Sequence, residues 1–221
     1  GIVFIELIRT RGLSPADIED VIISSVVPNV MHSVVNAMKK YFNRQPILVG
    51  PGIKTGIRLS CDNPREIGPD RIVDAVGAYE LYGGPVIAMD FGTATTYDLI
   101  LDEGVFTAGI TSPGLGTSAR SLWSDAAKLP EIEIAKPKSI LAKNTVTSMQ
   151  AGLVYGTIGQ AEYIIDKFKE ESGFEGIRVV ATGGLGRIIS EGTDKINVYD
   201  PELTLQGIRI IYEKTKASEH E

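Results

Sequence analysis

One stretch of the sequence constrains the fold more than any other, because it predicts strands joined by short turns. The apolar residues 86–89 lead to Asp90, and a turn that begins at Gly92 leads into a second strand over residues 96–101. An Asp-Glu-Gly turn then predicts a third strand over residues 105–111. Three strands connected in this way form an antiparallel meander, so we expect this part of the chain to be built on a β-sheet.

Helical and strand patterns alternate through the rest of the chain. Helices are predicted where apolar residues recur every three or four positions, and strands where short β-branched runs end at Gly or Pro. The first four residues, Gly1–Phe4, are interpreted as a strand fragment. Helices are expected over residues 30–42, 69–82, 117–122, 146–172 and 203–214, and further strands over residues 21–27, 46–49, 177–181 and 197–199.

This order of elements predicts an α/β protein of two units, residues 1–84 and residues 85–221. The second unit is expected to run β-β-β-α-α-β-α-β-α, and the first repeats part of that order without its opening hairpins. We therefore predict a duplicated two-domain architecture in which the first domain is incomplete in this chain.

Composition excludes several kinds of function. The chain has 221 residues and a formal net charge of −6, so nucleic acid is not expected as a main ligand. One cysteine and two histidines argue against a disulfide framework and against a metal site made of these residues. No apolar run is long enough to span a bilayer, and we expect a cytoplasmic protein that does not bind a membrane.

The turn at Asp90 has the composition of a phosphate-binding loop. Gly92 lets phosphate oxygens approach the backbone, and the N–H groups of such a turn can form a nest for an anion. The hydroxyls of Thr93 and Thr95 add donors, while the carboxylate of Asp90 can hold a cation. The alternative is an ordinary hairpin whose threonines only favour β structure.

A second glycine-rich turn, Thr182-Gly183-Gly184, lies between a predicted strand and a predicted helix. In α/β proteins the glycines at such a junction clear space for a nucleotide, and the helix N-terminus faces the ligand. By itself this turn is equally compatible with a simple connection. The chain has no Gly-x-x-x-x-Gly-Lys-Ser/Thr loop, so the two turns suggest a nucleotide held between domains without a Walker-type site.

The segment Gly68-Pro69-Asp70-Arg71 begins a predicted helix. The positive end of the helix dipole favours an ionised Asp70, which is therefore a candidate base or cation ligand. Arg71 can grip a carboxylate or phosphate through two hydrogen bonds. The alternative is an ion pair that only caps the helix. Taken alone, Thr145 at the start of the long helix and Cys61 are interpreted as structural residues.

Together these motifs resemble the type III pantothenate kinases, a family of the acetate and sugar kinase/actin-like superfamily. The resemblance implies an actin-like (ribonuclease H-like) duplicated fold and ATP-dependent phosphorylation of pantothenate, the first step of coenzyme A biosynthesis. The matching motifs follow the family's order over nearly the whole chain: Val21–Pro28, Gly52–Gly56, Asp62–Glu66, Gly68–Arg71, Asp90–Thr95, Pro113-Gly114, Lys143–Thr145, Ser148–Gly152, Thr182–Gly184 and Leu203–Leu205.

The resemblance also implies roles for single residues. Asp70 matches the proton acceptor, and Asp90 matches the ligand of a monovalent cation, K⁺ or NH₄⁺. Mg²⁺ is expected with the ATP, and a homodimer is expected because family members form one. Pantothenate contacts match Gly68, Pro69, Asp70, Arg71, Thr145 and Cys61, and ATP contacts match Gly92, Thr93, Thr95, Thr182, Gly183 and Gly184.

Three features depart from the family pattern. The family opens with Asp-x-Gly-Asn-Thr, which this sequence lacks, and Gly1–Phe4 is interpreted as a remnant of that strand. Cys61 stands where the family usually has tyrosine, so looser substrate binding is expected. Ala108-Gly109 replaces a Gly-Gly pair. Two other functions stay open: another small-molecule kinase of the same superfamily, and a non-catalytic nucleotide-binding protein with an accessory or regulatory role.

Overall fold

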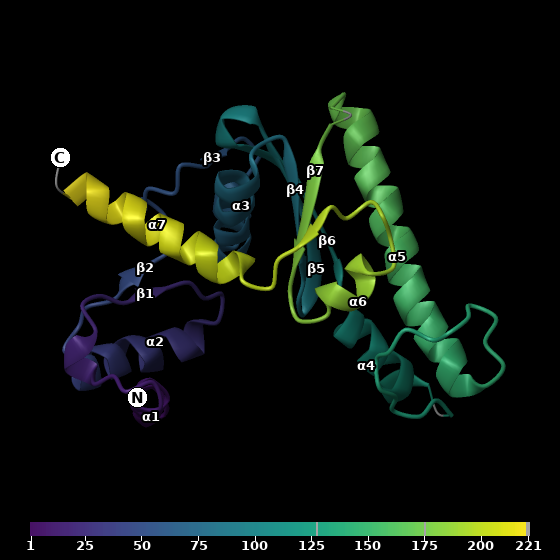
Figure 1. The fold of residues 1–221 in the computed structure, drawn as a ribbon, viewed down its shortest axis with the longest axis horizontal. Coiled ribbons are helices and arrows are strands. Elements are labelled where there is room, and N and C mark those ends of the chain that lie inside the picture. Colours follow the sequence, from purple (N-terminus) through teal and green to yellow (C-terminus); the bar gives the residue numbers. More distant parts are fainter. Residues whose placement is uncertain (127, 175, 220–221) are drawn as a thin grey trace.

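A mixed sheet of six strands, in the order β3-β6-β5-β4-β7-β8, forms the centre of the molecule (Figure 1). The computed structural model describes residues 1–126, 128–174 and 176–219. β4, β5 and β6 form the predicted antiparallel meander, and β7 and β8 continue the sheet in parallel beside β4. The strands are β3 (Arg58–Leu59), β4 (Val86–Phe91), β5 (Ala94–Leu101), β6 (Val105–Pro113), β7 (Arg178–Thr182) and β8 (Val198–Tyr199).

Helices cover both faces of this sheet, which confirms the predicted α/β class. On one face lies α3 (Pro69–Tyr82), and on the other lie α4 (Leu115–Asp125), α5 (Thr145–Ser172) and α6 (Gly186–Ser190) (Figure 1). The α4–α6 face holds the larger core, in which Phe91 and Tyr97 of the sheet pack with Leu153 and Ile158 of α5.

The two sides of α3 are both buried. Ala75 and Ala78 pack against the sheet, whereas Val73 and Val76 pack against the C-terminal helix α7 (Leu203–Glu219). A helix that is apolar on two sides must lie between two other layers. The first turn of α3, which carries the predicted substrate segment, is therefore held by a helix that cannot move independently of the sheet.

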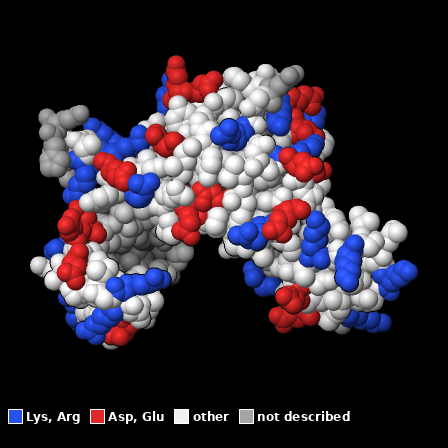
Figure 2. Space-filling view, viewed as in Figure 1, with Lys and Arg blue, Asp and Glu red and all other residues white. Residues whose placement is uncertain are grey.

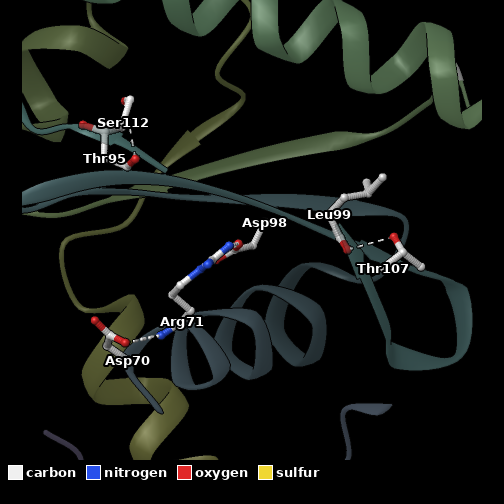
Figure 3. Close-up of polar contacts among 7 residues, drawn as sticks. All are labelled: Asp70, Arg71, Thr95, Asp98, Leu99, Thr107 and Ser112. Carbon is white, nitrogen blue, oxygen red and sulfur yellow. Dashed lines mark hydrogen bonds and ion pairs between the residues drawn. The ribbon is translucent and has the colours of Figure 1, made fainter. Parts of the chain in front are cut away.

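A β-bulge interrupts the pairing of β5 with β6. Leu99 pairs with Ala108 and Ile100 pairs with Phe106, so Thr107 is a surplus residue in β6. The hydroxyl of Thr107 donates a hydrogen bond of 3.3 Å to the carbonyl of Leu99, as Figure 3 shows. The bulge lies between the hairpin turn η4 (Asp102–Gly104) and the end of β6 that adjoins the Asp90 turn.

A smaller unit lies at the N-terminal end of the chain (Figure 1). In it, β1 and β2 pair in parallel, and Met38 and Phe42 form the centre of a small core. Its elements are α1 (Ile2–Arg9), the 3-10 helix η1 (Pro15–Asp17), β1 (Ile22–Ile23), α2 (Pro28–Ala37), the π-helical turn η2 (Met38–Phe42) and β2 (Ile47–Leu48), and a further 3-10 helix, η3 (Pro64–Glu66), precedes α3.

Two strand predictions in this unit are wrong. Gly1–Phe4 is not a strand, because residues 2–9 form the helix α1, whose Ile5 and Ile8 lie at helical spacing against the small core. The predicted strand over residues 21–27 is only the two-residue β1. Val26 and Val27 beyond it are 55% and 49% exposed, so their β-branched side chains do not mark a buried strand.

The packing crosses the predicted boundary at residue 84. β3 and α3, which precede it, pack on the six-stranded sheet, and α7, which follows it, contacts β1. The division into residues 1–84 and 85–221 therefore stays a prediction. Within the described ranges, no helix combines the length and the apolar character that crossing a membrane requires.

Glycines bring the backbones of α3 and α7 close together where the two helices cross. A Cβ atom on Gly207 would lie 2.1 Å from the carbonyl oxygen of Val73, and one on Gly77 would lie 2.8 Å from that of Leu203. At the same crossing the hydroxyl of Thr204 donates a hydrogen bond of 2.6 Å to the carboxyl group of Asp74.

The crossing predicts that Gly207→Ala lowers the free energy of unfolding by about 1–3 kcal/mol, because the added methyl group overlaps a backbone carbonyl that cannot easily move. Urea denaturation measures the change. The matched control is Gly116→Ala in α4, where the nearest atom to the added Cβ is 3.9 Å away. That control is expected to be neutral or to stabilise by up to about 1 kcal/mol. Equal stability of the two variants would contradict the close crossing.

Asp74 is an acidic group placed where its charge is unfavourable. Its side chain is 5% exposed. Burial raises its pKa to about 7, against the opposing hydrogen bond from Thr204, and the negative charges of Asp90, Asp70 and Asp98 raise it further. The folded protein therefore holds a proton on Asp74 over a pH range in which the unfolded chain has lost it.

The raised pKa predicts a pH-dependent effect of Asp74→Asn. Asp74 stabilises the fold fully below its unfolded pKa of 3.8, and this contribution is lost as the pH rises through about 7. Relative to the wild type, the Asn variant should therefore gain stability between acidic and neutral pH, by up to about 4 kcal/mol. Chemical denaturation at a series of pH values measures this gain. The exposed Asp194→Asn controls for the loss of one charge, and parallel stability curves would contradict the prediction.

Candidate active site

The two predicted glycine-rich turns meet around the carboxylate of Asp90. β4 and β7 run in parallel with Asp90 opposite Thr182, so both turns leave the same end of the sheet. A Cβ atom on Gly183 would lie 2.4 Å from Oδ1 of Asp90, and one on Gly92 would lie 3.0 Å from Oδ2. The space beside this carboxylate therefore exists because neither turn carries a side chain there.

A third turn supports the Asp90 turn from behind. The N–H of Gly114 donates to the carbonyl of Thr93 at 3.1 Å, and the hydroxyl of Thr117 donates to the same carbonyl at 2.8 Å. A Cβ atom on Gly114 would lie 2.3 Å from the carbonyl oxygen of Gly92. The backbone of the turn is thus fixed, while the side chain of Thr93 stays exposed.

Side chains alternate between the two faces of β5, and this separates Thr95 from the other candidates. Thr95 pairs with the core residue Phe91, whereas Thr96 pairs with Asp90 on the face that α3 covers. Thr95 is 1% exposed, and its hydroxyl has no hydrogen-bond partner among the described residues. Figure 3 shows it far along the strand from Arg71. The structure does not bring this hydroxyl to the side of Asp90, and an ATP contact by Thr95 stays a prediction.

The predicted substrate segment forms the beginning of α3. Gly68 is the N-cap, Pro69 occupies the first helical position, and Asp70 lies exposed in the first turn. Pro suits that position because its fixed φ matches a helix and its missing N–H has no partner there. Oδ1 of Asp70 accepts a hydrogen bond of 3.0 Å from the N–H of Arg71 and would lie 2.3 Å from a Cβ atom on Gly68.

Arg71 is paired with Asp98 of β5 and not with its neighbour Asp70. Its Nε donates to Oδ1 and Oδ2 of Asp98 at 3.1 and 3.2 Å, and its Nη2 also donates to Oδ1. In Figure 3 the Arg71 side chain extends from α3 to the sheet to reach this carboxylate. The side chain of Asp98 is 1% exposed and that of Arg71 is 17% exposed. Asp98 is absent from the sequence-predicted site, although an acid in an otherwise apolar stretch of strand is a detectable signal.

The charges at this end of the sheet act on one another. Burial raises the pKa of Asp90, and the negative charge of Asp70 raises it further. Burial also raises the pKa of Asp98, to about 6, although the hydrogen bonds and charge of Arg71 oppose the shift. Burial disfavours the charged form of Arg71, but Asp98 outweighs this effect, so the Arg71 pKa is raised. The excess of carboxylates over cationic groups here favours a bound cation.

The carboxylates that the structure describes do not by themselves make a complete set of metal ligands. Among the described residues, no group of three or more His, Cys, Asp or Glu side chains is arranged to hold a metal ion. A cation beside Asp90 would therefore take its remaining ligands from water, backbone or a phosphate group. Mg²⁺ in nucleotide sites is commonly bound in this way, by one or two carboxylates together with substrate phosphates.

The remaining predicted substrate contacts lie in different places. Cys61 is half-buried and close enough to Arg71 to influence its pKa. Thr145 begins α5, next to the N-cap Asn144, and lines a cavity of about 820 Å³ between α4 and α5 that neither Asp70 nor Arg71 lines. Figure 2 shows a broad notch between the lobe of α1 and α2 and the lobe of α4 and the first turns of α5.

Comparison with known proteins identifies the family of this chain. A protein-family model described as type III pantothenate kinase matches residues 1–167. A type III pantothenate kinase of Agathobacter rectalis is 61% identical over 214 residues, which cover 97% of this chain and 82% of that protein. One of Bacillus cytotoxicus is 49% identical over 221 residues, which cover 100% of this chain and 84% of that protein.

A solved structure gives independent support for the fold. The crystal structure of a Campylobacter jejuni protein described as a Baf family transcriptional activator superimposes with a TM-score of 0.60 and covers 96% of this chain and 89% of its own. At 16% sequence identity, that likeness concerns the fold alone. The family match over residues 1–167 and the two closely similar relatives establish more: the chain belongs to the type III pantothenate kinase family.

Proposed function

We propose that this chain phosphorylates pantothenate with ATP at the site formed by the Asp90 turn, the Thr182–Gly184 turn and the first turn of α3. As a type III pantothenate kinase, the chain is an enzyme that transfers a phosphoryl group from ATP to pantothenate, the first step of coenzyme A biosynthesis. One observation supports this location of the site. The turns that contain Gly92 and Gly183 meet around the carboxylate of Asp90, close to the charged first turn of α3.

The turns are suited to hold the polyphosphate of ATP. Thr93 offers a backbone N–H group and an exposed hydroxyl, and the missing side chains of Gly92 and Gly183 leave open space beside the carboxylate of Asp90. Mg²⁺, when bound with ATP beside the carboxylate of Asp90, would supply neutralisation of the charge on the triphosphate. Asp90 would hold the monovalent cation, K⁺ or NH₄⁺, in the space that Gly92 and Gly183 leave beside its oxygens.

Asp70 and Arg71 are assigned to pantothenate. Phosphoryl transfer asks a protein mainly for positioning and neutralisation of charge, because the transition state is loose. Asp70 orients the pantothenate hydroxyl and accepts its proton as the new O–P bond forms and the γ-phosphorus separates from the bridging oxygen that leaves with ADP. Arg71 binds the carboxylate at the other end of pantothenate, and Gly68, Pro69, Cys61 and Thr145 are further proposed contacts.

This assignment predicts that Asp70→Asn lowers kcat by a factor of about 10²–10⁴, because the amide cannot accept the proton. The KM for ATP should change little, since Asp70 is not assigned to the nucleotide. Steady-state kinetics with pantothenate and ATP measure both quantities. Asp102→Asn, an exposed change at the far hairpin, is the matched control. Wild-type turnover in Asp70→Asn would remove Asp70 from the proposed role.

We also infer that the fold is actin-like and duplicated. The sheet supports this finer assignment because β4 lies at its centre, with the antiparallel β5 and β6 on one side and the parallel β7 and β8 on the other. The small parallel sheet of β1 and β2 is then the remaining part of a second, similar module in this chain.

We further propose that the enzyme is a homodimer formed through α5. Along one side of this helix Gly152, Gly156 and Gly159 are exposed, and a Cβ atom added to any of them would meet no atom within 4 Å beyond its chain neighbours and the nearby backbone of α5. On the same stretch Tyr163 is 64% exposed. A row of small residues beside an exposed aromatic ring allows a second helix to approach closely.

The dimer proposal predicts a particle of about twice 23.8 kDa in light scattering. Gly156→Glu should shift the population to monomers, because it places a charged side chain in the close helix contact. Gly176→Glu is the matched control, since its added Cβ also lies in open space but in the connection that follows α5, outside the row of glycines. A monomeric wild type, or a Gly156→Glu variant that stays dimeric, would contradict the proposed surface.

A further inference from the structure

The buried partner of Arg71 has no part in the function proposed above. Asp98 and Arg71 lie 27 residues apart in sequence, on β5 and α3, and their contact joins the substrate segment to the sheet. The carboxylate of Asp98 is almost fully buried. Even a well-paired buried ion pair often adds little net stability, so the presence of this pair calls for an explanation beyond stability.

We propose that Asp98, with Gly109 and Phe106 of β6, holds the guanidinium of Arg71 in one orientation, so that its unoccupied edge is directed at the carboxylate of the substrate. Asp98 and Gly109 are then positioning residues that set the preference of the enzyme for an acidic substrate. This inference rests on the proposed function, because it takes pantothenate as the substrate.

The space around the guanidinium is closed on two further sides. A Cβ atom on Gly109 would lie 1.9 Å from Nη2 of Arg71 and 2.6 Å from Oδ1 of Asp98. The ring of Phe106 lies 5.7 Å from Cζ of Arg71, a distance at which a cation is attracted to an aromatic face. The guanidinium of Arg71 therefore has little freedom to rotate. The carboxylate of Asp98 binds one edge of it, and the backbone of Gly109 and the ring of Phe106 limit the space on the other two sides.

The pairing with Asp98 leaves one edge of the guanidinium available. Arginine has five N–H donors in a rigid plane, and Asp98 engages those on Nε and Nη2. In the described part of the chain Nη1 donates to no protein acceptor. Asp70 and Cys61 are both close enough to influence the pKa of Arg71. The edge formed by Nη1 and Nη2 matches the two oxygens of a carboxylate.

The charge of Asp98 argues for positioning over simple attraction. A buried carboxylate that neutralises Arg71 weakens the long-range pull of Arg71 on an anion. What the pair provides instead is a fixed direction for the remaining hydrogen bonds, and misplacement of a binding group by about 1 Å can cost about 100-fold in rate. A neutral substrate of the same shape has no carboxylate for these hydrogen bonds to hold. Loss of the fixed orientation should therefore lower kcat/KM for the acidic substrate and not for the neutral one.

The test compares pantothenate with its alcohol analogue, in which a hydroxymethyl group replaces the carboxylate. The variants are Asp98→Asn, which removes the charge at almost constant shape, and Gly109→Ala, which displaces the guanidinium sterically. Both should lower kcat/KM for pantothenate by about 10- to 100-fold. For the alcohol analogue kcat/KM should change little, and the KM for ATP should stay at the wild-type value. Ala108→Gly, whose side chain faces the opposite side of the sheet, is the matched control.

Each outcome separates this inference from the function on which it rests. Equal losses for both substrates would show that Asp98 and Gly109 only support the fold, and unchanged kinetics would show that they are not needed; either result overturns the inference. If the wild-type enzyme fails to phosphorylate pantothenate, the proposed function falls and the inference with it. Thermal melting of each variant checks folding, and should Asp98→Asn fail to fold, Gly109→Ala alone decides the question.

Discussion

The burial of α3 between the sheet and α7 is the constraint on which the site depends. Its alanines contact the sheet and its valines contact α7, so the direction of the helix is fixed on two sides. Because the helix is fixed, its first turn presents Asp70 and Arg71 at a constant place relative to the carboxyl end of β4. Asp70, the proposed base, would lack this rigidity if a loop carried it, and phosphoryl transfer depends on position more than on covalent chemistry.

Much of the six-stranded sheet and its helices could be predicted from local patterns. The limits of α3 agree with the prediction, since Pro69 and Gly83 mark the two ends of its apolar repeat. The weak points are the short strands. β3 consists of two residues, and it forms through contacts distant in sequence: its pairing with β6 and the packing of Leu59 against the sheet core. The pattern at Gly1–Phe4 favours a strand because Ile2, Val3 and Phe4 are β-branched or aromatic, yet these residues form the first turn of α1.

The sequence predicts those parts of the candidate site in which a motif determines the course of the backbone. Contacts between side chains of distant elements are harder to predict. The two glycine turns converge on Asp90 as parallel strands require. Asp98 has no motif of its own, and its role follows only from the face of β5 on which it lies. Thr95 shows the converse: its motif suggests a phosphate contact, yet the alternation of the strand turns its hydroxyl away from Asp90.

The surplus residue in β6 has a consequence for how the arginine is enclosed. Phe106 and Gly109 are three positions apart, so in a regular strand they would point to opposite faces. The bulge at Thr107 resets the alternation and places both toward α3. Deletion of one residue from β6 would turn either the ring of Phe106 or the backbone of Gly109 away from α3. The length of this strand is therefore tied to the way in which Arg71 is enclosed.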